Sequence, residues 1–330
     1  MIPKAIFLLA HEHWNNVYGT EECRRLQRLT SQSIPFYDPS SILENPRALE
    51  SAEIILSGWG MPMCDATFLA AAPNLKAVFY AAGSVRCFTT EALWRRNIIV
   101  SSSNKALAAA VAEFTLGQIL LSLKSMWRQM EETRVRRRYR QVSCPGIYGS
   151  VVGLISMGSI ARHLVALLRP FHVRIMVYDP LLSREEARNL GVQSASLDDL
   201  FKMADVVSLH APWLPETEGM IRGRHFKQMR RGATFINTAR GAIVNEPEMI
   251  EALRNRPDIF ALLDVTHPEP PILNSPLYDL RNIILTPHIA GAIGKECRRM
   301  GVLAIDEFER YLKKEALIGQ VSEAMMSVIA

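Results

Sequence analysis

The feature that most constrains the fold is an alternation of short aliphatic segments with longer helical segments, which occurs in two series along the chain. Such alternation predicts βαβ units and parallel sheets. The first series contains five expected strands, at residues 5–9, 34–37, 53–57, 76–80 and 98–101. The second contains six, at residues 151–155, 174–178, 205–209, 234–236, 260–264 and 283–285. Because 330 residues exceed what one core usually holds, we expect two doubly wound α/β domains.

The segments that flank the two series set the expected domain boundaries. A helical pattern with one Gly and no Pro runs from about residue 107 to residue 138, and Pro145 and Gly146 then break the chain. A charged amphipathic helix is expected at residues 298–314, returning to the first domain. We therefore predict one domain from residues 1–103 plus 297–330 and a second from residues 104–296.

Cysteine usage and hydropathy restrict the class of protein. The five cysteines are odd in number and widely spaced, and no C-x-x-C occurs, so we expect neither a disulfide framework nor a metal site. A reducing cytoplasm is the compartment that fits this usage. The chain contains no uninterrupted run of about 18 apolar residues, so no membrane span is predicted.

The net charge of +5 owes much to one short arginine-rich segment. Its members are Arg134, Arg136, Arg137, Arg138 and Arg140. We interpret it as a solvated helix end in which Glu132 pairs with Arg136 at i,i+4, with a dimer contact as an alternative. No aromatic interleaving or reader motif accompanies the arginines, so nucleic-acid binding is not expected.

Polar residues follow the six strands of the second series. They are residues 156–161, Asp179, His210, Arg240, Asp264 with Glu269, and His288. The carboxyl ends of parallel strands meet at one edge of a sheet, which is where open α/β sheets bind ligands. The sequence therefore predicts that a cation, carboxylates and a histidine converge there.

The turn after the first of these strands aligns with the dinucleotide fingerprint G-x-G-x-x-G. Ser156, Gly158 and Ala161 occupy the three positions, so one glycine of three is present. We expect Ser156 to keep the turn conformation with its hydroxyl toward the phosphates or solvent. Asp179 ends the next strand, where a carboxylate accepts from a ribose 2′-OH and repels a 2′-phosphate. This favours NAD over NADP, although Arg184 nearby could accommodate a phosphate.

Three later residues fit the reduction of a 2-oxo acid. Arg240 has the planar fork that binds a carboxylate. His288 could exchange the hydroxyl proton, and Glu269 could fix its tautomer by a hydrogen bond. Each alone also fits a structural role, as a helix cap, a turn residue or a loop residue.

Residues 234–245 (TFINTARGAIVN), together with residues 204–221, 262–271 and 282–292, resemble the D-isomer-specific 2-hydroxyacid dehydrogenases. The resemblance covers nearly the whole chain, including YAAGSVRCF in the first domain. It implies a flavodoxin-like substrate domain and a Rossmann NAD-binding domain with the active site in the cleft between them. It also implies a homodimer formed through the long helix from residue 107.

The resemblance implies a role for each candidate residue. Arg240 would anchor the substrate carboxylate, His288 would act as general acid/base, and Glu269 would be its partner. The implied cofactor residues are Ser156, Met157, Gly158, Ser159, Ile160, Asp179, His210, Pro212, Thr217, Thr238, Ala239, Asp264, His288 and Gly291. The implied substrate residues are Trp59, Ala82, Gly83, Ser84 and Arg240. Asp264 would hold the nicotinamide carboxamide.

Several assignments of function stay open. The leading one is an NAD(H)-dependent oxidoreductase that interconverts a small D-2-hydroxy acid and its 2-oxo acid, such as glyoxylate or hydroxypyruvate. A phosphoglycerate-dehydrogenase-like enzyme and a non-catalytic NAD-sensing, corepressor-like protein are alternatives. The segment from Ser84 to Arg86 departs from the family pattern. Arg86 would contact either a second anionic group of the substrate or, preferably, solvent or a dimer partner.

Overall fold

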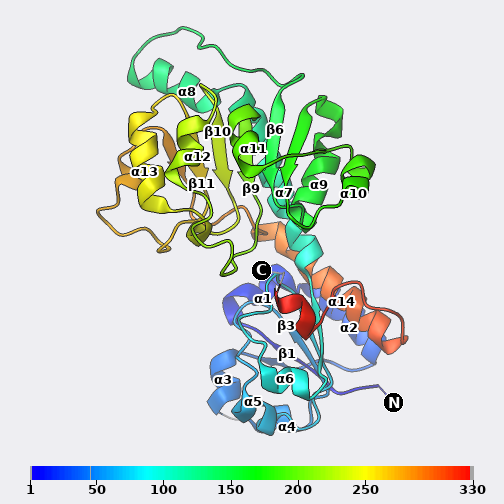
Figure 1. The fold of residues 1–330 in the computed structure, drawn as a ribbon. Helices are drawn as coiled ribbons and strands as arrows, with labels where there is room; N and C mark the ends of the chain where they lie inside the picture. The colour runs from blue at the N-terminus through cyan, green and yellow to red at the C-terminus, as the bar shows by residue number, and fades with distance from the viewer. Residues whose placement is uncertain (1, 45, 328–330) are drawn as a thin grey trace. The chain divides into compact units, whose positions relative to one another are not determined.

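The computed structural model describes residues 2–44 and 46–327, and the chain divides into two compact units. Unit 1 comprises Met1–Ala108 and Ala292–Ala330, and unit 2 comprises Ala109–Gly291. The expected boundaries, at residues 103 and 297, lie a few residues from these divisions. Both units are α/β, each built on its own mainly parallel sheet (Figure 1).

The sheet of unit 1 has the strand order β13-β5-β4-β3-β1-β2. Its parallel strands are β1 (Ala5–Leu8), β2 (Phe36–Tyr37), β3 (Ile54–Ser57), β4 (Ala77–Tyr80) and β5 (Ile99–Ser102). Their order, 2-1-3-4-5, is that of flavodoxin-like sheets. The sixth strand, β13 (Gln320–Val321), pairs antiparallel with β5 and was not predicted. It is held by the buried Glu307 carboxylate, which accepts the N–H groups of Ile318 and Gly319.

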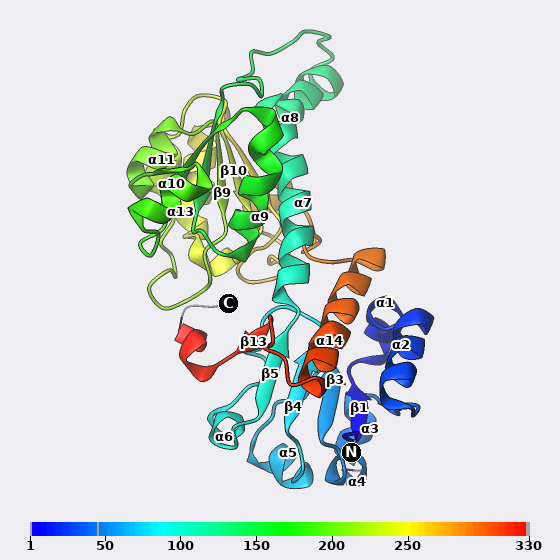
Figure 2. The ribbon, with the colours of Figure 1, turned by 90° about the vertical axis from the view of Figure 1, so that its right-hand side faces the viewer.

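Helices cover both faces of the unit 1 sheet. One group is α1 (His11–Val17), α2 (Thr20–Thr30) and α14 (Cys297–Leu312), and α14 packs on the sheet with the Phe308 ring 5.5 Å from that of Phe79 (Figure 2). The other group is α3 (Pro39–Glu44), α4 (Arg47–Glu50), α5 (Ala66–Ala71) and α6 (Glu91–Arg95), whose apolar side chains share a core with the opposite face. The predicted C-terminal helix is thus present and belongs to unit 1.

The sheet of unit 2 is entirely parallel and has the order β12-β11-β10-β9-β6-β7-β8. Its strands are β6 (Val151–Ile155), β7 (Arg174–Tyr178), β8 (Gln193–Ser194), β9 (Val206–Leu209), β10 (Thr234–Asn237), β11 (Phe260–Leu263) and β12 (Ile283–Leu285). Numbered from β6, the order is 3-2-1-4-5-6 with a seventh strand added, which is the Rossmann order. The short exposed β8 was not predicted, because two polar residues carry no strand pattern.

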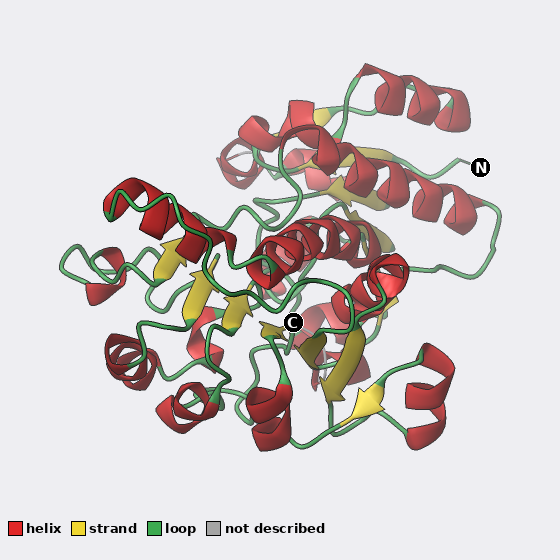
Figure 3. Ribbon diagram, turned by 90° about the horizontal axis from the view of Figure 1, so that it is seen from above, coloured by secondary structure: helices red, strands yellow, loops and turns green. Residues whose placement is uncertain are grey.

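Two helical layers bury the unit 2 sheet (Figure 3). Apolar side chains of α7 (Asn104–Leu123) and α9 (Ser159–Leu168) pack on one face. Those of α11 (Leu197–Met203), α12 (Gly223–Gln228) and α13 (Glu246–Asn255) pack on the other. Helix α10 (Arg184–Leu190) follows β7, and short 3₁₀ turns of unit 2 occur at Arg169–Phe171, Gly241–Ile243 and Pro276–Tyr278. Two further 3₁₀ turns, Gly294–Glu296 and Glu323–Ser327, belong to unit 1. Burial on both faces explains why the strands read as continuous aliphatic runs.

The expectation of one continuous helix to residue 138 is wrong. Helix α7 ends at Leu123, and Ser125 adopts a left-handed conformation with φ of 48°. The short helix α8 (Met126–Met130) and a π-helical turn (Glu131–Val135) follow. The predicted ion pair between Glu132 and Arg136 is confirmed, with 3.3 Å between the charged atoms.

Helix α7 is long and apolar enough to cross a membrane if length and composition alone are considered. The sequence prediction of no membrane span overlooked it, because polar residues interrupt its apolar run. Ala112, Ile119 and Leu123 on this helix are fully buried in the core of unit 2. Packing against the sheet therefore accounts for its apolar composition.

Candidate active site

Polar groups gather at the carboxyl edge of the unit 2 sheet, because its strands are parallel and six of them are followed by candidate functional side chains. They are Ser156 after β6, Asp179 after β7, His210 after β9, Arg240 after β10, Asp264 after β11 and His288 after β12. All six strands were predicted from the sequence. The structure places the residues that follow them at one edge of the sheet, as expected.

His288 and Glu269 form a hydrogen-bonded pair at this edge. The Nδ1 atom of His288 lies 2.6 Å from Oε1 of Glu269, and about half of each side chain is buried. The Arg240 guanidinium is close enough for the charge of Glu269 to raise its pKa, although burial lowers that pKa more strongly. The imidazole, the carboxylate and the guanidinium therefore belong to one electrostatic cluster.

Asp264 holds the loop that carries His288. Its Oδ1 accepts from the Thr286 hydroxyl at 2.6 Å and from the Ile289 N–H at 2.9 Å, and its Oδ2 accepts from the Ala290 N–H at 2.8 Å. A carboxylate has about four acceptor positions, so three are used within the protein and one stays open. His288 itself has a φ of 53°, a conformation that is uncommon for a non-glycine residue.

Asn237 organises the turn that presents Arg240, and sequence reasoning missed it. Its side chain is 1% exposed, accepts from the Ala239 N–H at 3.0 Å and donates to the Arg240 carbonyl at 3.0 Å. The Arg240 Nη1 donates to the Ala239 carbonyl at 2.6 Å, leaving its other donors unused by the described residues. The only available signal was an amide residue directly after the strand predicted at residues 234–236, which the structure extends to Asn237.

Ser156 adopts the backbone conformation of the glycine that it replaces. Its φ is 74°, which costs a non-glycine residue about 1–2 kcal/mol. The hydroxyl does not face phosphates or solvent as expected, but lies 3.4 Å from Oδ2 of Asp179. The same carboxylate oxygen accepts the Met157 N–H at 2.6 Å, and Oδ1 accepts the Leu181 N–H at 2.7 Å. Asp179 therefore ties the turn after β6 to the end of β7.

The N-terminus of α9 fits a pyrophosphate. Gly158 precedes the helix and no side chain caps the first N–H groups, which belong to Ser159, Ile160 and Ala161. A Cβ atom at Gly158 would meet nothing within 4 Å, so the space above the turn is open to a ligand. Uncapped N–H groups and the helix dipole together favour an anion at this position.

His210 is a buried, neutral side chain at the end of β9. Burial lowers its pKa to about 4, its Nε2 lies 3.0 Å from the Ser208 hydroxyl, and its Nδ1 has no partner among the described residues. Thr217 is used internally, since its hydroxyl donates to the Pro212 carbonyl at 2.6 Å. An orphaned ring nitrogen beside the open turn fits a cofactor-binding edge.

The remaining expected cofactor residues of unit 2 follow strands β10 and β12 in the chain. The Thr238 hydroxyl is buried and lies 3.4 Å from that of Thr115 on α7. Ala239 is buried, and Gly291 is partly exposed in the loop after His288. No contact in the structure assigns these residues to a cofactor, so that role stays a prediction.

In unit 1, the loop after β4 offers backbone donors. The N–H groups of Ala82, Gly83 and Ser84 donate to no acceptor among residues 2–44 and 46–327. The Ser102 hydroxyl donates to the Ala82 and Gly83 carbonyls at 3.1 and 2.5 Å, which turns the peptide groups so that their carbonyls are satisfied. Successive N–H groups without acceptors are donors of the kind that bind anions in backbone nests.

Two further candidate residues belong to unit 1. Trp59 lies against its core, and Arg86 follows the loop after β4 in the chain. Trp59 packs against the core and its ring meets that of His13 edge-on, with 5.0 Å between centroids. The Arg86 guanidinium donates to the Met326 carbonyl in the C-terminal segment. Arg86 thus binds the C-terminal segment of unit 1. Neither expectation, a contact with a substrate anion or exposure to solvent or a dimer partner, included this role.

No cluster of three or more metal-ligating side chains occurs among the residues that the structure describes. All five cysteines are unpaired.

Comparisons with known proteins assign the family. Residues 116–290, more than half of the chain, match the model for the NAD-binding domain of the D-isomer specific 2-hydroxyacid dehydrogenases. The chain is 31% identical over 242 residues to a D-3-phosphoglycerate dehydrogenase of Mycobacterium leprae, covering 72% of this chain and 45% of that protein. It is 29% identical over 272 residues to a glyoxylate reductase of Aeropyrum pernix, covering 80% and 81%. The chain spans less than half the length of the curated phosphoglycerate dehydrogenases that it matches.

A solved structure supports the same assignment at the level of the fold. It is the NAD-complexed form of a D-isomer specific 2-hydroxyacid dehydrogenase from Lactobacillus delbrueckii ssp. bulgaricus, with a TM-score of 0.79, 19% identity, and coverage of 96% of this chain and 100% of that chain. The family match includes the turn after β6 and the segments that carry Arg240, Glu269 and His288. This chain belongs to the D-isomer specific 2-hydroxyacid dehydrogenase family, a family of NAD-binding oxidoreductases.

Proposed function

We propose that this protein interconverts a small D-2-hydroxy acid and its 2-oxo acid, with glyoxylate or hydroxypyruvate as the substrate. The observation that carries the proposal is the His288–Glu269 pair, 2.6 Å apart, beside Arg240 at the carboxyl edge of the unit 2 sheet. Likeness to a glyoxylate reductase over 81% of that protein's length supports the substrate class. A pure nucleotide sensor would have no need of this acid/base pair.

His288 transfers the proton. Its Nδ1 faces the Glu269 carboxylate, which accepts a hydrogen bond and so fixes the tautomer with the proton on Nδ1. The Nε2 atom is then the atom that gives a proton to the carbonyl oxygen during reduction, or takes one from the hydroxyl during oxidation. Glu269 is a positioning residue in this scheme, because it acts through the imidazole.

Arg240 binds the substrate carboxylate. One Nη1 donor is used on the Ala239 carbonyl, which fixes the direction of the guanidinium, and the opposite donors are left for a bidentate contact. In unit 1, the N–H groups of Ala82, Gly83 and Ser84 are the proposed donors to the substrate, and Trp59 the proposed wall.

We infer NAD rather than NADP as the cofactor, which supplies or accepts the hydride when bound. The Asp179 carboxylate lies at the end of β7 and uses part of its acceptor capacity on Met157 and Leu181. The rest is available to ribose hydroxyl groups, and its negative charge disfavours a 2′-phosphate. Homodimer formation through α7 and a cytoplasmic location remain part of the proposal.

The test is a steady-state assay of the full chain. NADH or NADPH is mixed with glyoxylate, hydroxypyruvate, pyruvate or 3-phosphohydroxypyruvate, and loss of the reduced nicotinamide is followed by absorbance. Turnover is expected with NADH and a small 2-oxo acid. His288→Asn should lower kcat by about 10²–10⁴-fold without changing NADH affinity. His163 is exposed, and His163→Asn should leave kcat unchanged.

Glu269→Gln separates positioning from a structural role. The amide keeps the hydrogen bond but loses the charge, so kcat should fall by about tenfold or more, its pH profile should move, and KM should change little. NADH binding without turnover of any 2-oxo acid would reject the enzyme and favour the sensor.

A further inference from the structure

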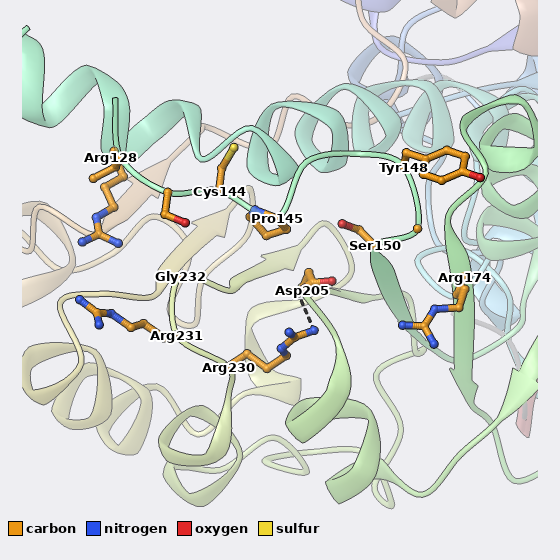
Figure 4. A pocket seen from close by; sticks show the side chains of 13 residues that line it. Arg128, Cys144, Pro145, Tyr148, Ser150, Arg174, Asp205, Arg230, Arg231 and Gly232 are labelled. Atoms are coloured by element: carbon orange, nitrogen blue, oxygen red, sulfur yellow. Dashed lines mark ion pairs between the residues drawn. The ribbon is translucent and has the colours of Figure 1, made fainter. Parts of the chain in front are cut away.

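Unit 2 contains a second candidate site, at the opposite edge of its sheet from Arg240 and His288. It is a cavity of about 640 Å³ lined by residues at the amino ends of four strands (Figure 4). Ser150 precedes β6, Arg174 begins β7, Asp205 precedes β9 and Gly232 lies before β10. The segment Val142–Pro145 closes one side. A strand separates each of these positions from the carboxyl edge, so the cavity is distinct from the candidate active site.

The lining carries an excess of positive charge. Four arginines contribute, namely Arg128, Arg174, Arg230 and Arg231, against a single carboxylate, Asp205. Asp205 is already satisfied, since its Oδ1 lies 2.9 Å from the Arg230 guanidinium and its Oδ2 accepts the Val151 N–H at 2.9 Å. One arginine is thus neutralised within the protein.

The other three guanidinium groups have no carboxylate partner among residues 2–44 and 46–327. Arg128, Arg174 and Arg231 form no side-chain hydrogen bond or ion pair with any described part of the chain. They come from three separate elements, helix α8, strand β7 and the turn before β10 (Figure 4). Like charges that share a concave space repel one another, and an anion bound among them removes that repulsion.

The size and chemistry of the cavity define a class of ligand. Guanidinium forks bind phosphate and carboxylate groups bidentately, and three of them are available. A volume of 640 Å³ lies within the range of about 300–1,000 Å³ that small-molecule sites occupy. We propose that this cavity binds a small polyanion, a molecule with two or more phosphate or carboxylate groups, independently of the cofactor turn.

Calorimetric titration of the full chain with inorganic pyrophosphate tests the proposal. NADH is present at saturation, so that the turn at Ser156–Gly158 is not available to the probe, and potassium chloride at equal ionic strength serves as the blank. We expect one saturable site per chain. Arg174→Gln and Arg231→Gln should each weaken pyrophosphate binding by about tenfold or more, since each removes charge-assisted hydrogen bonds.

Arg254→Gln is the matched control, because Arg254 is an exposed arginine on α13 outside the cavity. It should leave pyrophosphate binding unchanged. Arg174 and Arg231 are exposed and unpartnered, so their variants should fold, as thermal unfolding will verify. Citrate in place of pyrophosphate should give a site with the same dependence on both arginines.

Three results would overturn the proposal. One is the absence of saturable binding by either probe. A second is saturable binding that both Arg174→Gln and Arg231→Gln leave intact, which would assign the probe to another anion site such as the turn after β6 or Arg240. A third is a change in sedimentation on Arg174→Gln without any anion binding, which would assign the cavity to contact between copies of the chain.

Discussion

The two units use the same kind of sheet in different ways. Unit 2 places titratable side chains after its parallel strands, with His288, Glu269 and Arg240 in one cluster. Unit 1 places backbone donors after β4, in a loop whose side chains are small. A charged side chain can exchange a proton, whereas a backbone N–H can only donate a hydrogen bond. Under the proposed function, the groups that exchange the proton therefore belong to unit 2, and unit 1 supplies hydrogen-bond donors for the substrate.

The largest expected effect concerns the anchor of the His288 loop. Asp264→Asn replaces an acceptor with an amide that must point a donor at either the Ala290 N–H or the Thr286 and Ile289 donors. The substitution removes a charge-assisted hydrogen bond and leaves a buried donor unpaired. Together these changes should lower the free energy of unfolding by about 3–4 kcal/mol. Urea unfolding measures it, with the exposed Asp279→Asn as control. Equal stability of the two variants would contradict the anchoring role.

The next effect is a pH dependence that His210 of unit 2 should produce. Burial lowers the pKa of His210 from 6.5 to about 4, so between these values the unfolded chain binds a proton that the folded chain does not. Stability therefore falls as the pH drops from 6.5 toward 4, by about 2–3 kcal/mol for this group. His210→Gln should remove that part of the loss. The measurement is urea unfolding of both proteins across this pH range, and parallel curves would show that His210 titrates normally.

A smaller effect tests recognition by unit 1. Gly83→Ala would place a Cβ atom 2.5 Å from Cδ2 of Leu107, and because that atom ends a flexible side chain, the loop should shift without unfolding. The KM for the 2-oxo acid should rise by about fivefold, with kcat nearly unchanged. Gly117→Ala is the control, since a Cβ atom there meets nothing within 4 Å. A fall in kcat at constant KM would place part of the chemistry in unit 1.

The smallest expected effect is a gain in stability. Ser156→Gly relieves a φ of 74°, so the free energy of unfolding should rise by about 1 kcal/mol, minus the weak contact with Asp179. Ser159→Gly, at the ordinary helical start of α9, should instead lose about 0.5–1 kcal/mol. Thermal unfolding distinguishes the two. Destabilisation by Ser156→Gly would mean that the hydroxyl contact with Asp179 outweighs the backbone cost.

Much of the fold could be predicted because the strands are aliphatic and buried on both faces. The predicted bounds of β6, β7 and β12 agree with the structure, whereas the two-residue strands β8 and β13 carry no pattern of their own. The break after α7 was missed for a related reason: Ser125 is a residue of ordinary helix propensity, and only its left-handed φ ends the helix.

By itself, the sequence determined which polar residues follow which strands, and hence that Arg240 and His288 share one edge. The tertiary structure alone decided the contacts between them and their supports. Asn237 holds the Arg240 turn, Asp264 holds the His288 loop, and the Ser156 hydroxyl faces Asp179. The physical reason is the range of the two kinds of information. Periodicity reports burial along one segment, whereas a hydrogen bond joins residues that only the packed sheet brings within 3 Å.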